Sequence, residues 1–263
     1  MLILLPPSEG KSDPRRGKPL NLADLSFPEL TDARASVLQA LVDLCRGEET
    51  EAMRVLGLGS TQAEEVRRDA DLTTARTTRA DRVYSGVLYD ALDLASLDAA
   101  ARRRATRWLL IMSSLFGVVR PNDPIPAYRL SGDVTLPALD PGNGKVAAHW
   151  RAVLDPMVRE AAGSGLLVDL RSSTYAAFWR PARDLADRVA TVRVLHEQDG
   201  KRSVVSHFNK ATKGRLVRGL LSEGADPRTP QGLADDLTRL GWHVEAGEPT
   251  SKGTALDVVV TEL

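Results

Sequence analysis

The chain has 263 residues, of which 43% are hydrophobic, and 35 basic side chains balance 35 acidic ones. This length suits one large domain or two small ones, and the composition is that of an ordinary soluble globular protein. The zero net charge excludes a global positive field of the kind that attracts nucleic acid, although local basic clusters still bind phosphates.

No apolar run is long enough to span a membrane, and the short apolar start lacks the basic segment of a signal peptide. We therefore expect a cytoplasmic protein without a membrane partner. The single cysteine, Cys45, excludes an internal disulfide, and its apolar helical surroundings predict a buried small hydrophobe rather than a peroxide-sensing thiol. The four histidines show no metal-ligand spacing, so we expect no metal and no cofactor.

Residues 2–5 form the first predicted element, a buried strand that a proline pair terminates. The Gly-Lys-Ser sequence at residues 10–12 has the ending of a phosphate-binding P-loop. A P-loop needs a glycine where Leu5 stands, and the prolines remove N–H groups that such a loop uses. We therefore reject a P-loop and predict a simpler anion contact by Lys11 and Ser12, with an exposed polar loop as the alternative.

Helices are predicted over residues 31–45 and 50–56, followed by an apolar-Gly-apolar-Gly pattern that leads into a further helix. The pattern resembles the helix–hairpin–helix element of many DNA-binding proteins. Its glycines permit a tight left-handed turn, and the second helix presents free N–H groups to a phosphate. The alternative is an ordinary helix C-cap followed by a capping box. The candidate DNA-binding residues are Gly57, Leu58, Gly59, Ser60, Thr61, Arg67 and Arg68.

The next predicted elements are helices over residues 81–94 and 96–107 and a buried strand over 108–112. Ser113 and Ser114 follow this strand, and Arg120 and Arg129 come soon after. Backbone N–H groups and hydroxyls at the end of a strand, with guanidinium groups beside them, make a place for an anion. The alternative is that the serines cap a turn and the arginines are solvated or pair with nearby aspartates.

A long helix is predicted over 146–161, interrupted at Pro156, and a third buried strand over 166–170 precedes another serine pair that begins at Ser172. Because ligands gather outside the carboxyl ends of strands, the loops containing Ser8, Ser113 and Ser172 suggest a shared cleft.

The last third of the chain contains a predicted hairpin, 189–197 with 201–208, turned by an Asp-Gly pair. Lys210 and Lys213 then precede a helical run. Basic residues at a helix start oppose the helix dipole, which hints at a bound anion. A helix over 231–240 and strands over 242–245 and 256–262 close the chain. The candidate basic cleft contains Lys11, Ser12, Ser113, Arg120, Arg129, Ser172, Lys210 and Lys213.

These elements predict an α/β fold, a single domain over residues 1–263 with a mixed β-sheet flanked by helices and an inserted helix–hairpin–helix element. No nucleophile elbow, zinc-protease motif or dinucleotide fingerprint occurs, so the spacing of residues yields no catalytic mechanism and leaves open whether the protein is an enzyme.

Several segments together resemble the YaaA family of peroxide stress proteins. They run in order along nearly the whole chain: residues 1–4 with Pro7 and Lys11, 83–86, 112–121, 126–130, 149–150, 205–208, 210–211 and 213–214. The resemblance implies a bacterial protein that protects DNA and proteins from peroxide and is associated with lower free iron. It also implies a positively charged cleft, lined here by Lys11, Arg120, Arg129, Lys210 and Lys213, and a hairpin at 57–60 that binds duplex and branched DNA.

Two functions compete. The first is nonspecific DNA binding in oxidative stress, which limits iron-dependent damage; such phosphate contacts read no sequence and weaken with salt. The alternative is an enzyme acting on a nucleotide or phosphorylated small molecule in the same cleft. Basic residues leading from the cleft to the hairpin favour DNA, whereas a closed pocket of small-molecule size favours the enzyme. Direct iron handling is a third hypothesis, which the scattered histidines do not support.

Overall fold

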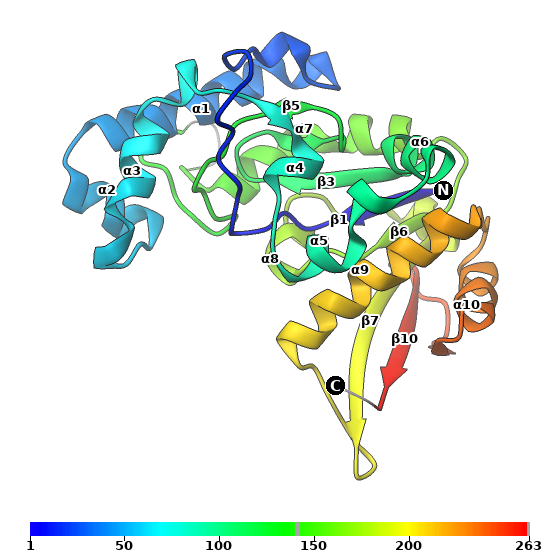
Figure 1. The fold of residues 1–263 in the computed structure, drawn as a ribbon. Coiled ribbons are helices and arrows are strands. Elements are labelled where there is room, and N and C mark those ends of the chain that lie inside the picture. Colours follow the sequence, from blue (N-terminus) through cyan, green and yellow to red (C-terminus); the bar gives the residue numbers. More distant parts are fainter. Residues whose placement is uncertain (140–142, 262–263) are drawn as a thin grey trace.

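The computed structural model describes residues 1–139 and 143–261, and these form an eight-stranded mixed sheet surrounded by helices (Figure 1). The strand order is β4-β3-β1-β6-β7-β10-β9, and β8 pairs with β7 off this path. Five strands are parallel to one another: β1 (Leu2–Leu5), β3 (Leu109–Ser113), β6 (Leu167–Asp169), β7 (Val189–Gln198) and β10 (Thr254–Val260). Three pair antiparallel: β4 (Gly117–Val119), β8 (Lys201–Ser203) and β9 (His243–Ala246).

The centre of the sheet is apolar because its strands are covered on both faces. Every residue of β1 and β3 is buried, and Ile3 of β1 lies opposite Leu109 on one side and Val168 on the other. Continuous apolar runs of this kind are typical of parallel strands between helical layers. A small separate sheet pairs β2 (Thr78–Arg79) with β5 (Pro124–Ile125).

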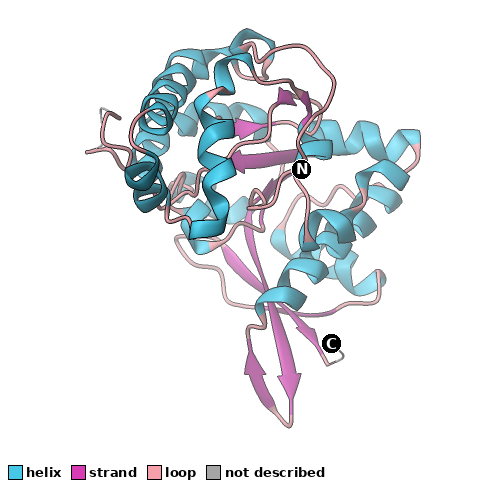
Figure 2. Ribbon diagram, turned by 60° about the vertical axis from the view of Figure 1, so that its left-hand side comes forward, coloured by secondary structure: helices cyan, strands magenta, loops and turns pink. Residues whose placement is uncertain are grey.

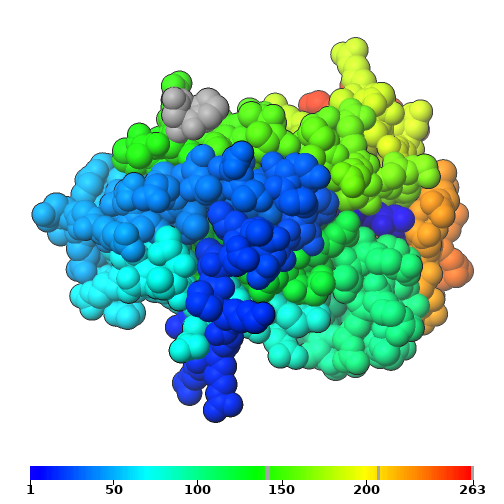
Figure 3. Space-filling view, turned by 90° about the horizontal axis from the view of Figure 1, so that it is seen from above, coloured from blue at the N-terminus to red at the C-terminus, as the bar shows by residue number. Residues whose placement is uncertain are grey.

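Helices pack on the sheet along most of its length, while the ends of β7, β8 and β10 project beyond them (Figure 2). Helices α2 and α3, in light blue and cyan, lie at the opposite end of the molecule from α10, in orange (Figure 3). The helices are α1 (Thr31–Arg46), α2 (Glu49–Leu56), α3 (Ala63–Ala70), α4 (Ala80–Val83), α5 (Val87–Leu92), α6 (Ala99–Trp108), α7 (Val146–Ala162), α8 (Ser173–Ala176), α9 (Ser206–Glu223) and α10 (Pro230–Arg239).

The α/β class, the mixed sheet and the single domain are confirmed, and three local predictions are wrong. The helix predicted over 81–94 is broken into α4 and α5, because Gly86 adopts a positive φ of 94°. The helix at Pro156 is not interrupted, since α7 continues through it with Leu154 and Val158 buried on either side. The second strand of the predicted hairpin ends at Ser203, because α9 already begins at Ser206.

Within the described residues, no helix combines the length and the apolar character needed to cross a bilayer.

Candidate functional site

The chain reverses its direction of travel across the sheet between β1 and β6. From β1 it moves to β3 on one side, and it later returns to β6 on the other side of β1. In open α/β sheets, ligands bind outside the carboxyl ends of the strands at such a switch point. A cavity of about 610 Å³ opens at this place, and its walls include the loops that follow β1 and β6.

Three other segments complete the cavity. The break between α4 and α5 contributes Ser85 and Gly86, α5 itself contributes Val87 to Tyr89, and the first turns of α9 contribute Asn209, Lys210 and Lys213. Figure 1 shows α5, α8 and the start of α9 gathered near the carboxyl end of β1. The remaining lining residues are Pro6, Pro7, Ser8, Glu9, Gly10, Leu170, Ser172, Ser173, Tyr175 and Val204.

The lysines give the cavity a surplus of positive charge. The Lys213 ammonium donates a hydrogen bond to the Leu170 carbonyl oxygen at 3.0 Å, and burial lowers its pKa. Lys210 is exposed at the cavity. Among the described residues neither lysine has a carboxylate within ion-pair distance, and both oxygens of the nearby Asp169 accept hydrogen bonds from Nε and Nη2 of Arg171. Glu9, an acidic residue of the wall, pairs with Arg129 at 3.1 Å.

Lys11 lies beside this wall rather than among the lining residues. Its ammonium donates to the Ser8 carbonyl oxygen at 2.8 Å and sits 4.2 Å from the centre of the Tyr128 ring, a cation–π contact. Burial lowers the pKa of Lys11 to about 8, and the nearby Glu9 carboxylate opposes that shift. Lys11 therefore supports the loop after β1, which carries part of the cavity wall.

The four tyrosines of the chain gather around Lys11 and the cavity. Tyr84 and Tyr89 stack with ring centres 5.4 Å apart, and the hydroxyls of Tyr84 and Tyr128 lie 3.0 Å apart. Tyr175 lines the wall with Tyr89. Ser113 is fully buried beneath this cluster, where its hydroxyl bonds to the Tyr128 hydroxyl at 2.8 Å. The cluster joins, through hydroxyl hydrogen bonds and ring contacts, side chains that are far apart in the sequence.

The structure brings only part of the predicted basic cleft together. Ser172, Lys210 and Lys213 line the cavity, and Arg129 reaches it through Glu9. Ser12 lies in an exposed loop. Arg120 lies elsewhere, because its guanidinium donates to the carbonyl oxygens of Thr106 and Arg107 at the end of α6, the first at 3.3 Å.

The predicted hairpin lies between α2 and α3. Gly57 ends α2 in the left-handed region, at φ 66° and ψ 35°, and Gly59 is extended before the short 3₁₀ turn Ser60–Gln62. The amide of Gly59 is already engaged, since it donates to the Gln62 side chain at 3.0 Å. Two helices joined by a glycine turn are therefore present, but a helix–hairpin–helix element of the DNA-binding kind is not confirmed.

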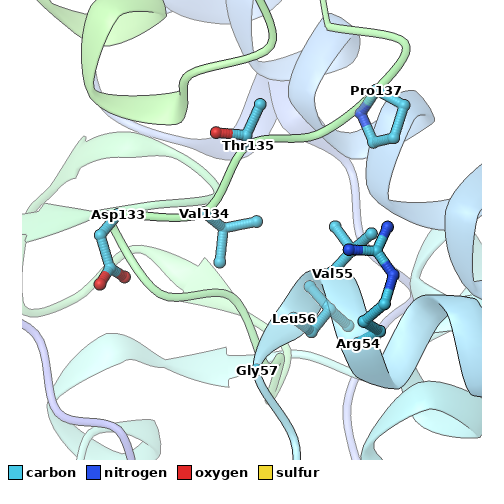
Figure 4. A pocket seen from close by; sticks show the side chains of 8 residues that line it. All are labelled: Arg54, Val55, Leu56, Gly57, Asp133, Val134, Thr135 and Pro137. Atoms are coloured by element: carbon cyan, nitrogen blue, oxygen red, sulfur yellow. The ribbon is translucent and has the colours of Figure 1, made fainter.

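Acidic side chains neutralise the arginines of this segment. Arg67 pairs with Glu49 at 3.3 Å and with Glu64 at 3.4 Å, and Arg68 pairs with Glu65. Arg54 pairs with Glu51 in the same way. A groove of about 520 Å³ separates the end of α2, from Arg54 to Gly57, from the loop Asp133 to Pro137 (Figure 4). It shares no lining residue with the cavity at the switch point.

A buried carboxylate connects α3 with the cavity wall. Both oxygens of Asp69, at 3.0 and 3.2 Å, accept the backbone N–H of Arg129, whose guanidinium pairs with Glu9. Burial raises the pKa of Asp69 to about 8, although the Arg129 N–H and the charges of Arg68 and Lys11 favour the ionised form.

Comparison with known proteins identifies the family of this chain. The family model described as peroxide stress protein YaaA matches residues 1–247. The chain belongs to the YaaA family. A UPF0246 protein of Streptomyces coelicolor is 54% identical over 265 residues, covering 100% of both chains. A UPF0246 protein of Corynebacterium glutamicum is 40% identical over 259 residues, covering 98% of this chain and 100% of the relative. An uncharacterised protein of Campylobacter jejuni is 28% identical over 217 residues, covering 82% and 83%.

In this member of the YaaA family, the single cysteine is poorly suited to react with peroxide. Cys45 is buried, and desolvation raises the pKa of its thiol to about 12, so the reactive thiolate is disfavoured.

Sequence reasoning missed several cavity residues, among them Ser85, Gly86, Val204 and Asn209. For Ser85 and Gly86 the signal was the glycine inside a predicted helix, which marks a break. Val204 and Asn209 had no such signal in the sequence.

Proposed function

We propose that this protein acts in the response to hydroperoxides by binding DNA phosphates without sequence specificity, which limits iron-dependent damage. The observation that carries the proposal is the pair Lys210 and Lys213, two cations at one cavity with no carboxylate within ion-pair distance among the described residues. Phosphate is the anion that such lysines most often bind in nucleic-acid complexes, and contacts of this kind are independent of sequence. Duplex and branched DNA offer the same backbone, so both are candidate partners.

The turn at Gly57 to Thr61 is a second, weaker candidate contact. The turn is exposed, and a Cβ atom at Gly57 would meet no heavy atom within 4 Å, so a phosphate has room to approach. Helix starts leave N–H groups free for an anion. However, Arg67 and Arg68 are paired with glutamates, so we expect the turn to contribute less than the lysines.

Fluorescence anisotropy with labelled duplex DNA, at low and moderate salt, tests the proposal. We expect the native chain to bind with an affinity that falls steeply with salt, because each neutralised phosphate releases counterions. The double variant Lys210→Ala/Lys213→Ala should lose at least about tenfold in affinity, and its salt slope should be smaller by about two contacts. Gly59→Asp, which adds a negative charge to the turn, should lose less.

The matched control is Lys201→Ala/Lys252→Ala, which removes two exposed lysines away from the cavity and should bind as the native chain does. Thermal unfolding of each variant should be measured to check that the variant is folded. Equal losses in the two double variants would mean that only total charge matters. The absence of binding by the native chain would refute DNA as the partner.

The cavity favours a second candidate function, an enzyme or binding protein for a phosphate-bearing small molecule. Ligand sites for small molecules are concave, mostly apolar and of about 300–1,000 Å³, and the cavity has about 610 Å³. Its position at the switch point of the sheet is the usual one for such ligands. Retained binding of a small phosphate compound by a chain that does not bind DNA would select this function.

A further inference from the structure

We propose that the cavity at the switch point binds a free nucleoside monophosphate, with its phosphate at Lys210 and Lys213 and its ring against the apolar wall formed by the loop after β1, α5 and Val204. The inference deepens the second candidate function above and rests on it.

The phosphate end of the cavity is defined by cations and free hydroxyls. Lys213 uses one N–H on the Leu170 carbonyl oxygen, which orients its ammonium and leaves other N–H groups for a ligand. The hydroxyls of Ser85, Ser172 and Ser173 line the same cavity and make no hydrogen bond to the described part of the chain. Cations with several free hydroxyl donors suit the oxygens of a phosphate monoester.

A second group of lining side chains is apolar. Pro6 and Pro7 after β1 line the cavity together with Val87 and Leu88 of α5. Val204 completes this wall and is 63% exposed, and within residues 1–139 and 143–261 it is the one large hydrophobic side chain that is exposed. An apolar side chain left in water beside a concave site gains free energy when a ligand covers it.

The combination of lysines, hydroxyls and apolar side chains in one cavity favours an amphipathic ligand. Inorganic phosphate would leave the apolar wall uncovered, and a purely apolar compound would leave the two lysines without an anion. A nucleoside monophosphate has both a dianionic group and a planar ring with apolar faces. The backbone of an intact duplex presents phosphates but keeps its bases stacked inside, so it offers nothing to the apolar wall.

Isothermal titration of the full chain with each of the four 5′-ribonucleoside monophosphates tests the inference, with inorganic phosphate and the matching nucleosides as comparisons. We expect at least one nucleotide to bind about tenfold or more tightly than either phosphate or its nucleoside. Lys210→Ala/Lys213→Ala should weaken nucleotide and phosphate binding by about tenfold or more. Val204→Ser should weaken nucleotide binding severalfold and leave phosphate binding unchanged, and Lys201→Ala/Lys252→Ala should change neither.

Three outcomes would overturn the inference and separate it from the functions on which it rests. Equal affinities for nucleotide and phosphate would show that the ring is not recognised, while the phosphate site would stand. Nucleotide binding that survives the Lys210/Lys213 double substitution would place the nucleotide elsewhere. If neither compound binds but duplex DNA does, the small-molecule function fails together with the inference, and the DNA function stands.

Discussion

Gly214 of α9 lies directly on the backbone of α5, so that a Cβ atom at this position would be 2.3 Å from the Leu88 carbonyl oxygen. The same atom would lie 2.9 Å from the Ala91 side chain and 3.0 Å from the Leu92 backbone nitrogen. Real Cβ atoms do not approach backbone atoms this closely, so the two helices cross at the distance that only glycine allows. The crossing places Lys213, the preceding residue, beside the Leu88 wall of the cavity.

Gly214→Ala should therefore force α9 away from α5. We expect a loss of about 1–3 kcal/mol in the free energy of unfolding, the usual cost of overpacking, measured by urea denaturation. Gly219→Ala in the same helix is the control, because its Cβ would meet only the flexible Leu240 side chain, at 3.2 Å. There the higher helix propensity of alanine should leave stability equal or slightly higher. Equal effects of the two substitutions would contradict the close crossing.

Arg34 holds three segments together from within the core. It is fully buried, and its guanidinium donates to the carbonyl oxygens of Ser26 at 2.8 Å, Val118 at 3.0 Å and Phe116 at 3.1 Å. Arg34→Met keeps much of the apolar stem but leaves these buried acceptors without donors. We expect a loss of about 3–5 kcal/mol in the free energy of unfolding.

Urea denaturation of Arg34→Met beside Arg46→Met checks this role, because Arg46 stands on the same helix and is exposed. We expect Arg46→Met to cost about 1 kcal/mol or less, because the hydrogen bond that its Nε donates to the Ala70 carbonyl oxygen at 3.0 Å is exposed. A small effect of Arg34→Met would show that water or relaxation of the backbone satisfies the carbonyl oxygens.

Asp69 should make stability depend on pH. Burial raises its pKa to about 8 in the folded chain, above the value of about 3.9 in an unfolded chain. Between these values the folded state binds more protons than the unfolded state, so the contribution of Asp69 to stability falls as pH rises through this window. Asp69→Asn keeps an acceptor for the Arg129 amide and does not titrate.

The variant should therefore gain stability relative to the native chain when the pH is raised from about 5 to about 8, as measured by urea denaturation at both values. Asp71→Asn, an exposed change just beyond α3, is the control and should show no such trend. A constant difference between Asp69→Asn and the native chain across this range would refute a strongly raised pKa.

Much of the fold follows from short-range patterns in the sequence. The apolar run at residues 2–5 and the helix at Thr31 could be predicted closely, because a buried strand and an amphipathic helix each have a strong local period. The break at Gly86 was missed, since the apolar residues on both sides keep helical spacing and tertiary packing decides the conformation.

The site was predictable only in outline. Hydroxyl-rich loops after two strands correctly place Ser8 and Ser172 at one cavity, because parallel strands end at the same edge of a sheet. The third serine, Ser113, follows the same rule but turns into the core to meet Tyr128. Arg120 shows the same limit, since its carbonyl partners on α6 depend on tertiary packing. Spacing in the sequence contains no information on which way such side chains point.

The most direct test of the cavity as an anion site is a crystal structure of the native chain soaked in selenate, a phosphate analogue whose selenium gives an anomalous signal. We predict an anomalous peak within hydrogen-bond distance of the Lys210 and Lys213 ammonium groups and near the hydroxyl of Ser172 or Ser173. The peak should be absent from crystals of Lys210→Ala/Lys213→Ala. Selenate bound only at surface arginines, with none in the cavity of the native chain, would contradict the account.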